Sequence, residues 1–347
     1  MYHVIMCGGI GSRFWPMSTH KVPKQFLKLI DNKSLLRLTV DRLLEVTSID
    51  KILLITSEKY KELILADLPD VPQGNILYEP SPMNTAPAIY LASKYVELIN
   101  SKETIGIYPA DHYIKDISTF KQNINDISQY IDNNSKNICT LGIKPSYPST
   151  SYGYIECEKN EENGIYSVSK FKEKPNLDTA KELVENDQFV WNSGMFFFNV
   201  STMIAEMDRY VPKLSSLYSS IDYDRDNFLN KIDSIWNDMP KISIDYAVME
   251  KSDNICCMKS DFGWSDLGTW VALHELLEKD TDGNVLNGNI LKHDAKNNLI
   301  FSDSNLVTVV GLDNVGVINY NGKILVIDLE KSEEVRYIIE QLDNKDK

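Results

Sequence analysis

The sequence predicts an α/β fold, a mostly parallel sheet sandwiched by helices, followed by a small unit of strands near the C-terminus. Two observations predict it. From residue 2 to about residue 200, short β-branched runs alternate with helical patterns. This alternation is typical of a parallel sheet covered by helices on both faces. After Gly283, short apolar runs are separated only by Asn, Gly and Asp turns, which predicts an all-β unit.

The predicted strands of the sheet are short apolar runs bounded by polar segments. They cover Tyr2–Met6, Ile52–Thr56, Ile76–Glu79, Ile105–Pro109 and Ile138–Ile143. Ligands bind such sheets at the carboxyl ends of the strands. Gly8–Arg13 follows the first strand and Asp111 follows the fourth, so both stretches are expected at a ligand site.

The predicted helices between these strands are Ser34–Val46, Asn84–Asn100 and Ser118–Asp132. The second has the strongest signal, because Asn84 or Thr85 can cap it and Pro87 lies in its first turn. Its apolar residues also recur at helical spacing on one face. Residues 201–251 are acidic and mostly helical in pattern, and we expect them to form an insertion or flank.

The C-terminal strands are predicted from six short apolar runs, Val285–Leu286, Ile290–Leu291, Leu299–Phe301, Leu306–Val310, Val315–Ile318 and Ile324–Ile327. A helix near Glu333–Leu342 is expected to close this unit. The change in pattern lies near Lys279–Gly283. We therefore expect two domains, residues 1–280 and residues 281–347.

Charge excludes some classes of partner. The 347 residues include 36 Lys and Arg against 50 Asp and Glu, a net charge of −14, so an extended basic face for nucleic acid is not expected. Residues 1–30 nevertheless hold four cations and no carboxylate: Arg13, Lys21, Lys24 and Lys28. This basic island on an acidic protein indicates a small anionic ligand bound at one place.

The sequence also predicts a cytoplasmic protein without a membrane segment. No apolar run approaches the roughly 18–20 residues that a membrane span needs. Gly8 and Gly9 end the first apolar run too early for a signal peptide. The five cysteines are scattered and contain no C-x-x-C pair, which indicates a reducing compartment and no cysteine metal site.

The stretch MCGGIGSRFWPMSTHKVPKQF, Met6–Phe26, combines glycines with cations after a strand, as phosphate-binding loops do. It matches neither of two common phosphate loops. The dinucleotide pattern G-x-G-x-x-G begins at Gly9 and Gly11 but meets Phe14 in place of its third glycine. The P-loop pattern fails because Arg13 stands five residues after Gly8. A glycine turn with solvated lysines is the alternative.

Four further stretches carry chemistry-bearing residues at strand ends or turns. Asp111 in YPADHYI and Asp266 in WSDLGTW are candidate Mg²⁺ ligands, because two converging carboxylates plus substrate phosphates form a normal Mg²⁺ site. FKEKP, Phe171–Pro175, carries a lysine beside a proline. WNSGMF carries Asn192, an amide suited to a sugar hydroxyl. Each stretch taken alone is more readily explained as structural, for example by aspartate capping a turn.

Together these stretches resemble the bacterial mannose-1-phosphate guanylyltransferases, or GDP-mannose pyrophosphorylases, of the sugar nucleotidyltransferase family. The matching pieces, in family order over residues 8–270, are GGIGSRFWPMS, PKQF, NTAPAI, PADH, YGYIE, FKEKP, WNSGMFFF, SIDYAVME and WSDLGTW. FWPMS, NTAPAI and SIDYAVME indicate the mannose branch. The family often has a basic residue where this chain has Met83, which puts a contact from that position in doubt.

The resemblance implies a Rossmann-like nucleotide-diphospho-sugar transferase fold with a C-terminal left-handed parallel β-helix. It implies no isomerase activity, because the isomerase domain that some relatives carry is not expected here. It also implies a role for each matching residue. Nucleotide binding falls to Gly8, Gly9, Gly11, Arg13, Lys24, Asn84, Thr85 and Asp111. The metal ligands are Asp111 and Asp266. The sugar-phosphate set is Gly153, Glu156, Glu173, Lys174, Asn192 and Asp245. The catalytic set is Arg13, Lys24, Lys174, Asp111 and Asp266.

The implied reaction joins mannose 1-phosphate to the α-phosphorus of GTP and expels pyrophosphate, with Mg²⁺ as cofactor and a homodimer in keeping with the family. A phosphate monoester is already charged at neutral pH, so no general base is required. The enzyme must instead bring two anions together with cations.

Three alternatives stay open at this stage. The first is another sugar 1-phosphate, such as a heptose 1-phosphate, or another nucleotide. The second is a related-fold glycosyltransferase with a D-x-D metal motif, for which Asp222–Asp226 and Asp280–Asp282 are weak candidates because neither follows a buried strand. The third is an inactive nucleotide-sensing relative, against which the retained cations and carboxylates argue.

Overall fold

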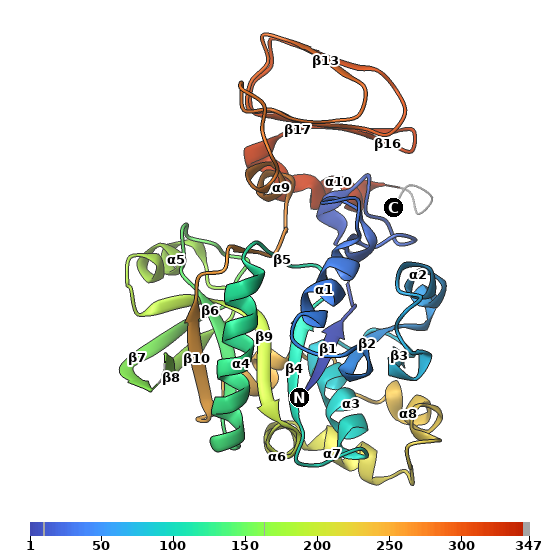
Figure 1. Ribbon diagram of the computed structural model, residues 1–347, viewed down its shortest axis with the longest axis vertical. Coiled ribbons are helices and arrows are strands. Elements are labelled where there is room, and N and C mark those ends of the chain that lie inside the picture. Colours follow the sequence, from blue (N-terminus) through green and yellow to red (C-terminus); the bar gives the residue numbers. More distant parts are fainter. Residues whose placement is uncertain (10, 163, 343–347) are drawn as a thin grey trace. The chain divides into compact units, whose positions relative to one another are not determined.

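The computed structural model describes residues 1–9, 11–162 and 164–342 (Figure 1). They form two compact units. The first unit comprises Met1–Gly8, Thr39–Ala110 and Ile114–Trp264, and the second comprises the described residues of Gly9–Leu38, Asp111–Tyr113 and Ser265–Lys347. The short strands β5 (Tyr113–Ile114) and β11 (Trp264–Ser265) lie where the chain passes between units. This division differs from the expected domains 1–280 and 281–347, which stay a prediction.

Nine of the described strands build the sheet of the first unit, in the order β3-β2-β1-β4-β9-β6-β10-β8-β7. Their bounds are β1 Tyr2–Met6, β2 Ile52–Ser57, β3 Ile76–Glu79, β4 Thr104–Pro109, β6 Ile138–Ile143, β7 Tyr154–Glu162, β8 Ile165–Lys172, β9 Phe189–Asn199 and β10 Ile255–Ser260. The β3-β2-β1-β4 and β6-β10 neighbours are parallel, while β9 runs antiparallel between β4 and β6. All five predicted strands are present, and their carboxyl ends share one edge.

Helices of the first unit cover both faces of this sheet. The first is α1 (Leu35–Leu44), which belongs to this unit from Thr39 onward. The others are α2 Lys61–Asp67, α3 Thr85–Glu97, α4 Ile117–Asn133, α5 Leu177–Val184, α6 Val200–Tyr210, α7 Pro212–Ser219 and α8 Phe228–Trp236. Val4 and Ile107 pack with α3, α6, α7 and α8 in one core cluster. Tyr108 points to the other face, where its ring meets Phe120 of α4 and Phe197. This alternation is what a sheet buried on both sides requires.

Local signals explain where the helices begin. Asn84 caps α3 as predicted, since its Oδ1 accepts a hydrogen bond from Thr85 N at 2.8 Å. Asp116 caps α4 in the same way, accepting from Thr119 N at 3.0 Å. In the described part of the chain, no helix combines the length and the apolar character that crossing a membrane demands.

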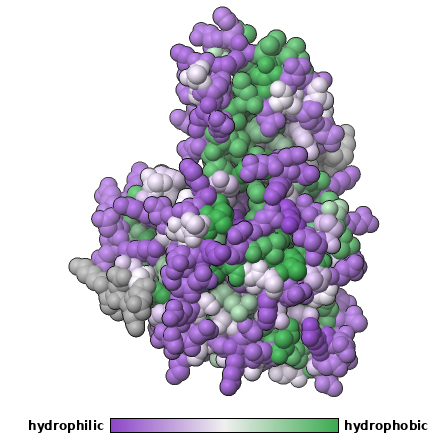
Figure 2. Space-filling model, viewed as in Figure 1, coloured by the Kyte–Doolittle hydropathy of each residue, from purple (hydrophilic) through white to green (hydrophobic). Residues whose placement is uncertain are grey.

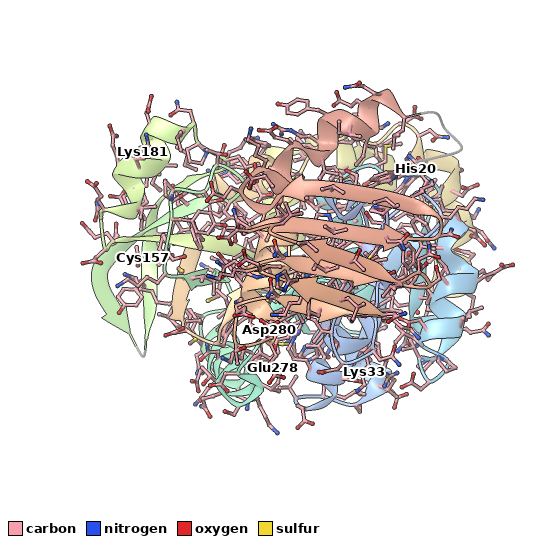
Figure 3. All side chains as sticks on the ribbon, turned by 90° about the horizontal axis from the view of Figure 1, so that it is seen from above. His20, Lys33, Cys157, Lys181, Glu278 and Asp280 are labelled. Carbon is pink, nitrogen blue, oxygen red and sulfur yellow. The ribbon has the colours of Figure 1, made fainter. Side chains whose placement is uncertain are left out.

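The second unit contains stacked coils of a parallel β-helix, seen from above in Figure 3 near the labelled Asp280. Its strands are β12 Val285–Asn287, β13 Ile290–His293, β14 Leu299–Ser302, β15 Val307–Val310, β16 Val315–Tyr320 and β17 Lys323–Asp328. β12, β14 and β16 are parallel, as are β13 and β15, and β17 turns back along β16. Buried Asn284 and Asn298 stack between coils, joined by a 3.0 Å hydrogen bond from Asn298 Nδ2 to Asn284 Oδ1. The left-handed sense stays a prediction.

The core of the second unit joins the N-terminal loop to these strands. The ring of Phe14, in the short helix η1 (Ser12–Phe14), packs at a tilt against Trp270 of α9 (Trp270–Leu276), with 4.7 Å between the ring centroids. The Trp270 ring is in turn 6.3 Å from Phe301 of β14. The 3-10 helix η7 (Leu329–Glu334) and α10 (Val335–Gln341) complete the same cluster through Leu329 and Val335. The loop that follows β1 therefore folds with the distant end of the chain.

Candidate active site

The glycine loop has a backbone that other residues would strain. Gly9 and Gly11 have φ values of +86° and +65°, in the left-handed region. A Cβ on Gly11 would lie 2.2 Å from Cβ of Lys24, which no side chain could tolerate. Ser18 fixes the loop further by donating from Oγ to the Gly11 carbonyl at 2.7 Å. Glycine at position 11 thus lets the loop and Lys24 approach closely.

Lys24 is buried at 5% exposure, and its ammonium already has two partners in the second unit. It forms an ion pair of 2.9 Å with Oδ2 of Asp111 and donates to the backbone carbonyl of Asp266 at 2.6 Å. Both aspartates predicted as metal ligands are therefore brought to one ammonium, although Asp266 meets it through its backbone. Lys24 acts here as the centre of the arrangement rather than as a mobile cation.

The two aspartates differ in how they are held. Burial would raise the pKa of Asp111, but the charges of Lys24 and His112 outweigh it and lower that pKa below its usual range. Asp266 instead caps its own turn, where Oδ1 accepts from Gly268 N at 3.0 Å beside Leu267 at φ +46°. Asp111 is therefore ionised at neutral pH, as a metal ligand must be.

Arg13 is a cation of the loop whose guanidinium has no partner among the described residues. It lies in η1, half-buried, and forms no hydrogen bond or ion pair with the residues that the structure describes. An arginine held by its backbone but free at its guanidinium offers a planar fork for phosphate oxygens. The position is the one predicted for triphosphate binding.

Glu79 is a candidate that the sequence analysis missed. It ends β3 in the first unit at 8% exposure, and its carboxyl group makes no hydrogen bond or ion pair with the described residues. Burial raises its pKa to about 7. A buried carboxyl without partners is costly, so it indicates a ligand with paired N–H donors. The only signal in the sequence was a glutamate as the last residue of a buried strand.

The loop after Glu79 leads to Asn84 and Thr85, the residues predicted to line the base pocket. Its carbonyl at Ser81 accepts a hydrogen bond from Trp236 Nε1 at 2.6 Å, which fixes the loop. Asn84 is exposed and has φ +75°. The Thr85 hydroxyl is already engaged, because it accepts from Ile244 N at 2.8 Å.

Four residues of the predicted sugar set meet on one side of the sheet in the first unit. Asn192 of β9 donates from Nδ2 to Oδ1 of Asp245 at 3.2 Å. A Cβ on Gly153 would lie 2.6 Å from Oε2 of Glu173 and 3.4 Å from Cβ of Asn192, so glycine leaves room there. Oδ1 of Asn192 accepts from Gly194 N at 3.1 Å, which fixes the amide orientation.

The charges of this group are closely packed. Burial, together with the charge of Glu173, raises the pKa of Asp245 to about 6. Lys174 has φ +45°, and its Nζ pairs with Oε1 of Glu173 at 2.6 Å while its side chain stays 58% exposed. Oε1 of Glu250 accepts from Glu173 N at 3.0 Å. The exposed ammonium can meet a sugar phosphate, and Glu250 supports the turn that carries it.

Glu156 is not brought into this group. Along β7, Ile155 lies opposite Val190 and Glu156 lies opposite Phe189 of β9. Directly opposed residues share a face, and successive residues alternate. Phe189 belongs to a separate small cluster with Tyr154 and Trp191, whereas Asn192 lies on the face of Val190. The side chain of Glu156 therefore points away from Asn192, and the register of β7 explains the difference from expectation.

Comparisons with known proteins identify the family of the chain. The nucleotidyl transferase family model matches residues 2–283, and that of the mannoseP isomerase/GMP-like β-helix domain matches residues 288–342. A mannose-1-phosphate guanylyltransferase of Escherichia coli is 37% identical over 98% of this chain and 75% of its own length. The chain belongs to the mannose-1-phosphate guanylyltransferases of the nucleotidyl transferase family.

Two further members of the comparison extend this result. A mannose-1-phosphate guanylyltransferase of Sinorhizobium fredii is 36% identical over 97% of this chain and 67% of its own length. A crystal structure from Thermus thermophilus, described as a mannose-1-phosphate geranyltransferase, matches 98% of both chains with a TM-score of 0.87 and 29% identity. The α/β fold with a β-helix near the C-terminus is thereby confirmed, and the chain is a nucleotidyltransferase.

Proposed function

We propose that this nucleotidyltransferase joins mannose 1-phosphate to the GMP part of GTP, giving GDP-mannose and pyrophosphate. The names of its relatives support the substrates. The observation that carries the proposal is the guanidinium of Arg13, which has no partner in the described part of the chain and lies in one unit with the Lys24–Asp111 pair and the Asp266 turn. Such a set binds a triphosphate and a cation together.

The proposed chemistry needs no general base. The phosphate of mannose 1-phosphate is the nucleophile, and its oxygen forms a bond to the α-phosphorus of GTP while the bond to the pyrophosphate oxygen breaks. A phosphate monoester has a second pKa near ~6, so it attacks as an anion. Arg13 is proposed to hold the triphosphate and Lys174 the sugar phosphate. Bringing two anions into line in this way supplies most of the rate.

We propose Mg²⁺ as the cofactor, with Asp111 and Asp266 as its protein ligands. The donor set fits, because Mg²⁺ is commonly bound by one or two carboxylates and completed by substrate phosphates and water. No group of three or more His, Cys, Asp or Glu side chains arranged for a metal occurs in residues 1–9, 11–162 and 164–342, so the phosphates would have to complete the shell. When bound, Mg²⁺ neutralises phosphate charge.

Guanine selection is proposed for Glu79. A carboxylate can accept from the N1–H of guanine and from its exocyclic N2–H at the same time, and adenine offers no such pair. Glu79 has no partner among the described residues and lies at the strand edge that leads to Asn84. Guanine would therefore remove the cost of a buried carboxylate that the free enzyme carries.

Sugar recognition is proposed for Asn192, Asp245 and Glu173, with Lys174 on the phosphate. The fixed amide of Asn192 can donate its second N–H to a sugar hydroxyl, and the two carboxylates can accept from sugar hydroxyls. Their contacts in the first unit support a role on one substrate. Glu156 is not proposed, because the register of β7 turns it to the other face.

A pyrophosphate-release assay over a panel of nucleoside triphosphates and sugar 1-phosphates tests the proposal. We expect GTP with mannose 1-phosphate to be the best pair. A better rate with a heptose 1-phosphate would replace the sugar but keep the reaction class. No pyrophosphate with any pair, together with sugar transfer from a nucleotide sugar, would favour the glycosyltransferase alternative.

We propose a homodimer that uses the β-helix and no nucleic-acid or membrane partner. Four aliphatic side chains on its strands are 60–65% exposed, and Figure 2 shows a hydrophobic area over these strands: Leu291, Val310, Ile324 and Val326. Patches of this kind mark interaction sites. Light scattering is expected to give a dimer for the wild type and a monomer for Val326→Lys. A cytoplasmic location is also proposed, supported by five free cysteines.

A further inference from the structure

Two hydrogen bonds tie the start of α3 to the segment that precedes Asp245. Ile244 N donates to Oγ1 of Thr85 at 2.8 Å, and Ala86 N donates to the Ile242 carbonyl at 3.1 Å. Both partners belong to the first unit. The first bond is formed by a side chain, so it depends on which residue stands at position 85.

Loss of the hydrogen bond to Thr85 would leave a buried N–H group without a partner. Ile244 is 2% exposed, so its N–H has little access to water if the hydroxyl is removed. A buried donor left without a partner costs about 1–3 kcal/mol. The segment is therefore expected to move until the N–H finds water or another acceptor.

The carboxylate of Asp245, in the sugar group, would move with this segment. Asp245 follows Ile244 directly and opens η6, a π-helical turn spanning Asp245–Met249. Turns of this type are frequent at functional sites because they aim side chains that a regular helix would not. The 3.2 Å contact from Asn192 Nδ2 to Asp245 Oδ1 depends on that aim.

We infer that Thr85 is a positioning residue for the sugar-phosphate side: its hydroxyl holds Ile244 N–H and so sets the position of Asp245. This differs from the nucleotide-binding role that family resemblance implies for Thr85. The inference rests on the proposed function, since it takes Asp245 as a sugar ligand. The hydrogen bond of Thr85 also links α3, whose first turn follows the proposed base pocket, to the sugar group.

Thr85→Val tests the inference because it keeps the branched shape and removes the acceptor. We expect KM for the sugar 1-phosphate to rise on the order of tenfold, the scale of one lost hydrogen bond to a buried donor. KM for GTP should stay within about twofold, because no nucleotide contact is removed. Thr85→Ser keeps the hydroxyl and should recover most of the loss. Asp245→Asn is the positive control for the sugar side.

The possible outcomes separate the two proposals. Wild-type activity on the substrate panel tests the proposed function first, and the variants are then compared on whichever sugar 1-phosphate the wild type uses. A Thr85→Val effect confined to KM for GTP, or no effect at all, overturns the inference. An equal loss in Thr85→Val and Thr85→Ser overturns it too, because the hydroxyl would then be irrelevant. If Thr85→Val does not fold, Thr85→Ala is measured against Thr85→Ser in its place.

Discussion

Lys24 and Arg13 illustrate how two cations of one loop are used differently. The ammonium of Lys24 is buried between Asp111 and the Asp266 carbonyl, with the Gly11 backbone against its stem. Lys24→Arg would be a milder change than Arg13→Lys only if the pocket of Lys24 had room for a guanidinium. The packing leaves none, so the larger guanidinium must displace Asp111 or the loop.

We therefore expect Lys24→Arg to be at least as damaging as Arg13→Lys. Arg13→Lys should lose ~1.5–3 kcal/mol in kcat/KM, since it keeps the charge and loses the fork. Steady-state kinetics at saturating Mg²⁺, with a thermal melt as the folding control, make the comparison. Wild-type kcat/KM in Lys24→Arg would show that the space around Lys24 adapts to the larger side chain. Wild-type kcat/KM in Arg13→Lys would favour the alternative that the loop is a glycine turn with solvated cations.

Glu79 couples stability to pH. Its pKa is raised from 4.5 to about 7 by burial, so the folded state holds its proton more tightly than the unfolded state. That contribution to the free energy of unfolding is fully present below pH 4.5 and is lost as pH rises through 7. Glu79→Gln removes the titration and should be more stable than the wild type at pH 8, by up to about 3 kcal/mol, with little difference at pH 4.5.

The same substitution should reduce guanine selectivity. Inosine lacks the N2 amine of guanine, so the ratio of kcat/KM for GTP over ITP reports the proposed carboxylate contact. We expect this ratio to fall towards one in Glu79→Gln. Urea unfolding at the two pH values and the GTP/ITP ratio are independent measurements. If Glu79→Gln gains stability but the GTP/ITP ratio of kcat/KM does not change, Glu79 does not contact the base.

At the scale of elements, the turn after β8 depends on Glu250. Lys174 there has φ +45°, a conformation that costs a non-glycine residue about 1 kcal/mol or more. Oε1 of Glu250 accepts from Glu173 N and helps to hold that turn. Glu250→Ala should raise KM for the sugar 1-phosphate by about three- to tenfold.

Glu250→Gln is the matched control for that prediction, because it removes the charge but keeps a carbonyl acceptor. It should be less impaired than Glu250→Ala. If both variants lose the same amount, the charge of Glu250 matters rather than its hydrogen bond. KM for GTP, measured alongside, should change little in either variant.

Prediction from sequence succeeded where the signal is local. The five parallel strands and the helices α1, α3 and α4 follow from β-branched runs, helical spacing and caps. The hairpin of β7 and β8 and the long β9 were not predicted as elements of the sheet. Their positions depend on pairing with partners far along the chain, which no local pattern contains.

The site shows the same limit. The motifs predicted which residues belong to the loop around Lys24 and to the group around Asn192. The face that each side chain takes depends on strand register, and for this reason Glu156 was assigned to a group from which it points away. Glu79 and the hydrogen bond between Thr85 and Ile244 were not predicted, because each depends on a single residue that belongs to no repeating sequence pattern.

At the scale of the whole molecule, the phosphate loop and the β-helix share one core. Phe301 of β14 belongs to the cluster that holds Phe14 and Trp15 of the loop. Phe301→Ala should cost about 3–5 kcal/mol in that unit and split thermal unfolding into two transitions. GTP should then raise the lower transition, because ligand stabilises the unit that binds its phosphates.

The matched control for that prediction is Phe198→Ala, a fully buried phenylalanine of the sheet in the first unit. Its cavity should weaken the other transition instead. Calorimetry with and without GTP distinguishes the two variants. A single transition in both, shifted equally by GTP, would mean that the units unfold together and that the shared core has no separate effect on the loop.

The shared core also has a consequence for synthesis of the chain on the ribosome. The loop 9–38 emerges almost first, yet most of its partners begin at Ser265. At about 5–20 residues per second, the loop waits for tens of seconds with Phe14 and Trp15 uncovered. The sheet of the first unit can form during that time, but nucleotide binding cannot mature until the last coils are translated. A nascent chain therefore exposes an apolar segment to which chaperones can bind. It does not bind GTP before translation of the chain is complete.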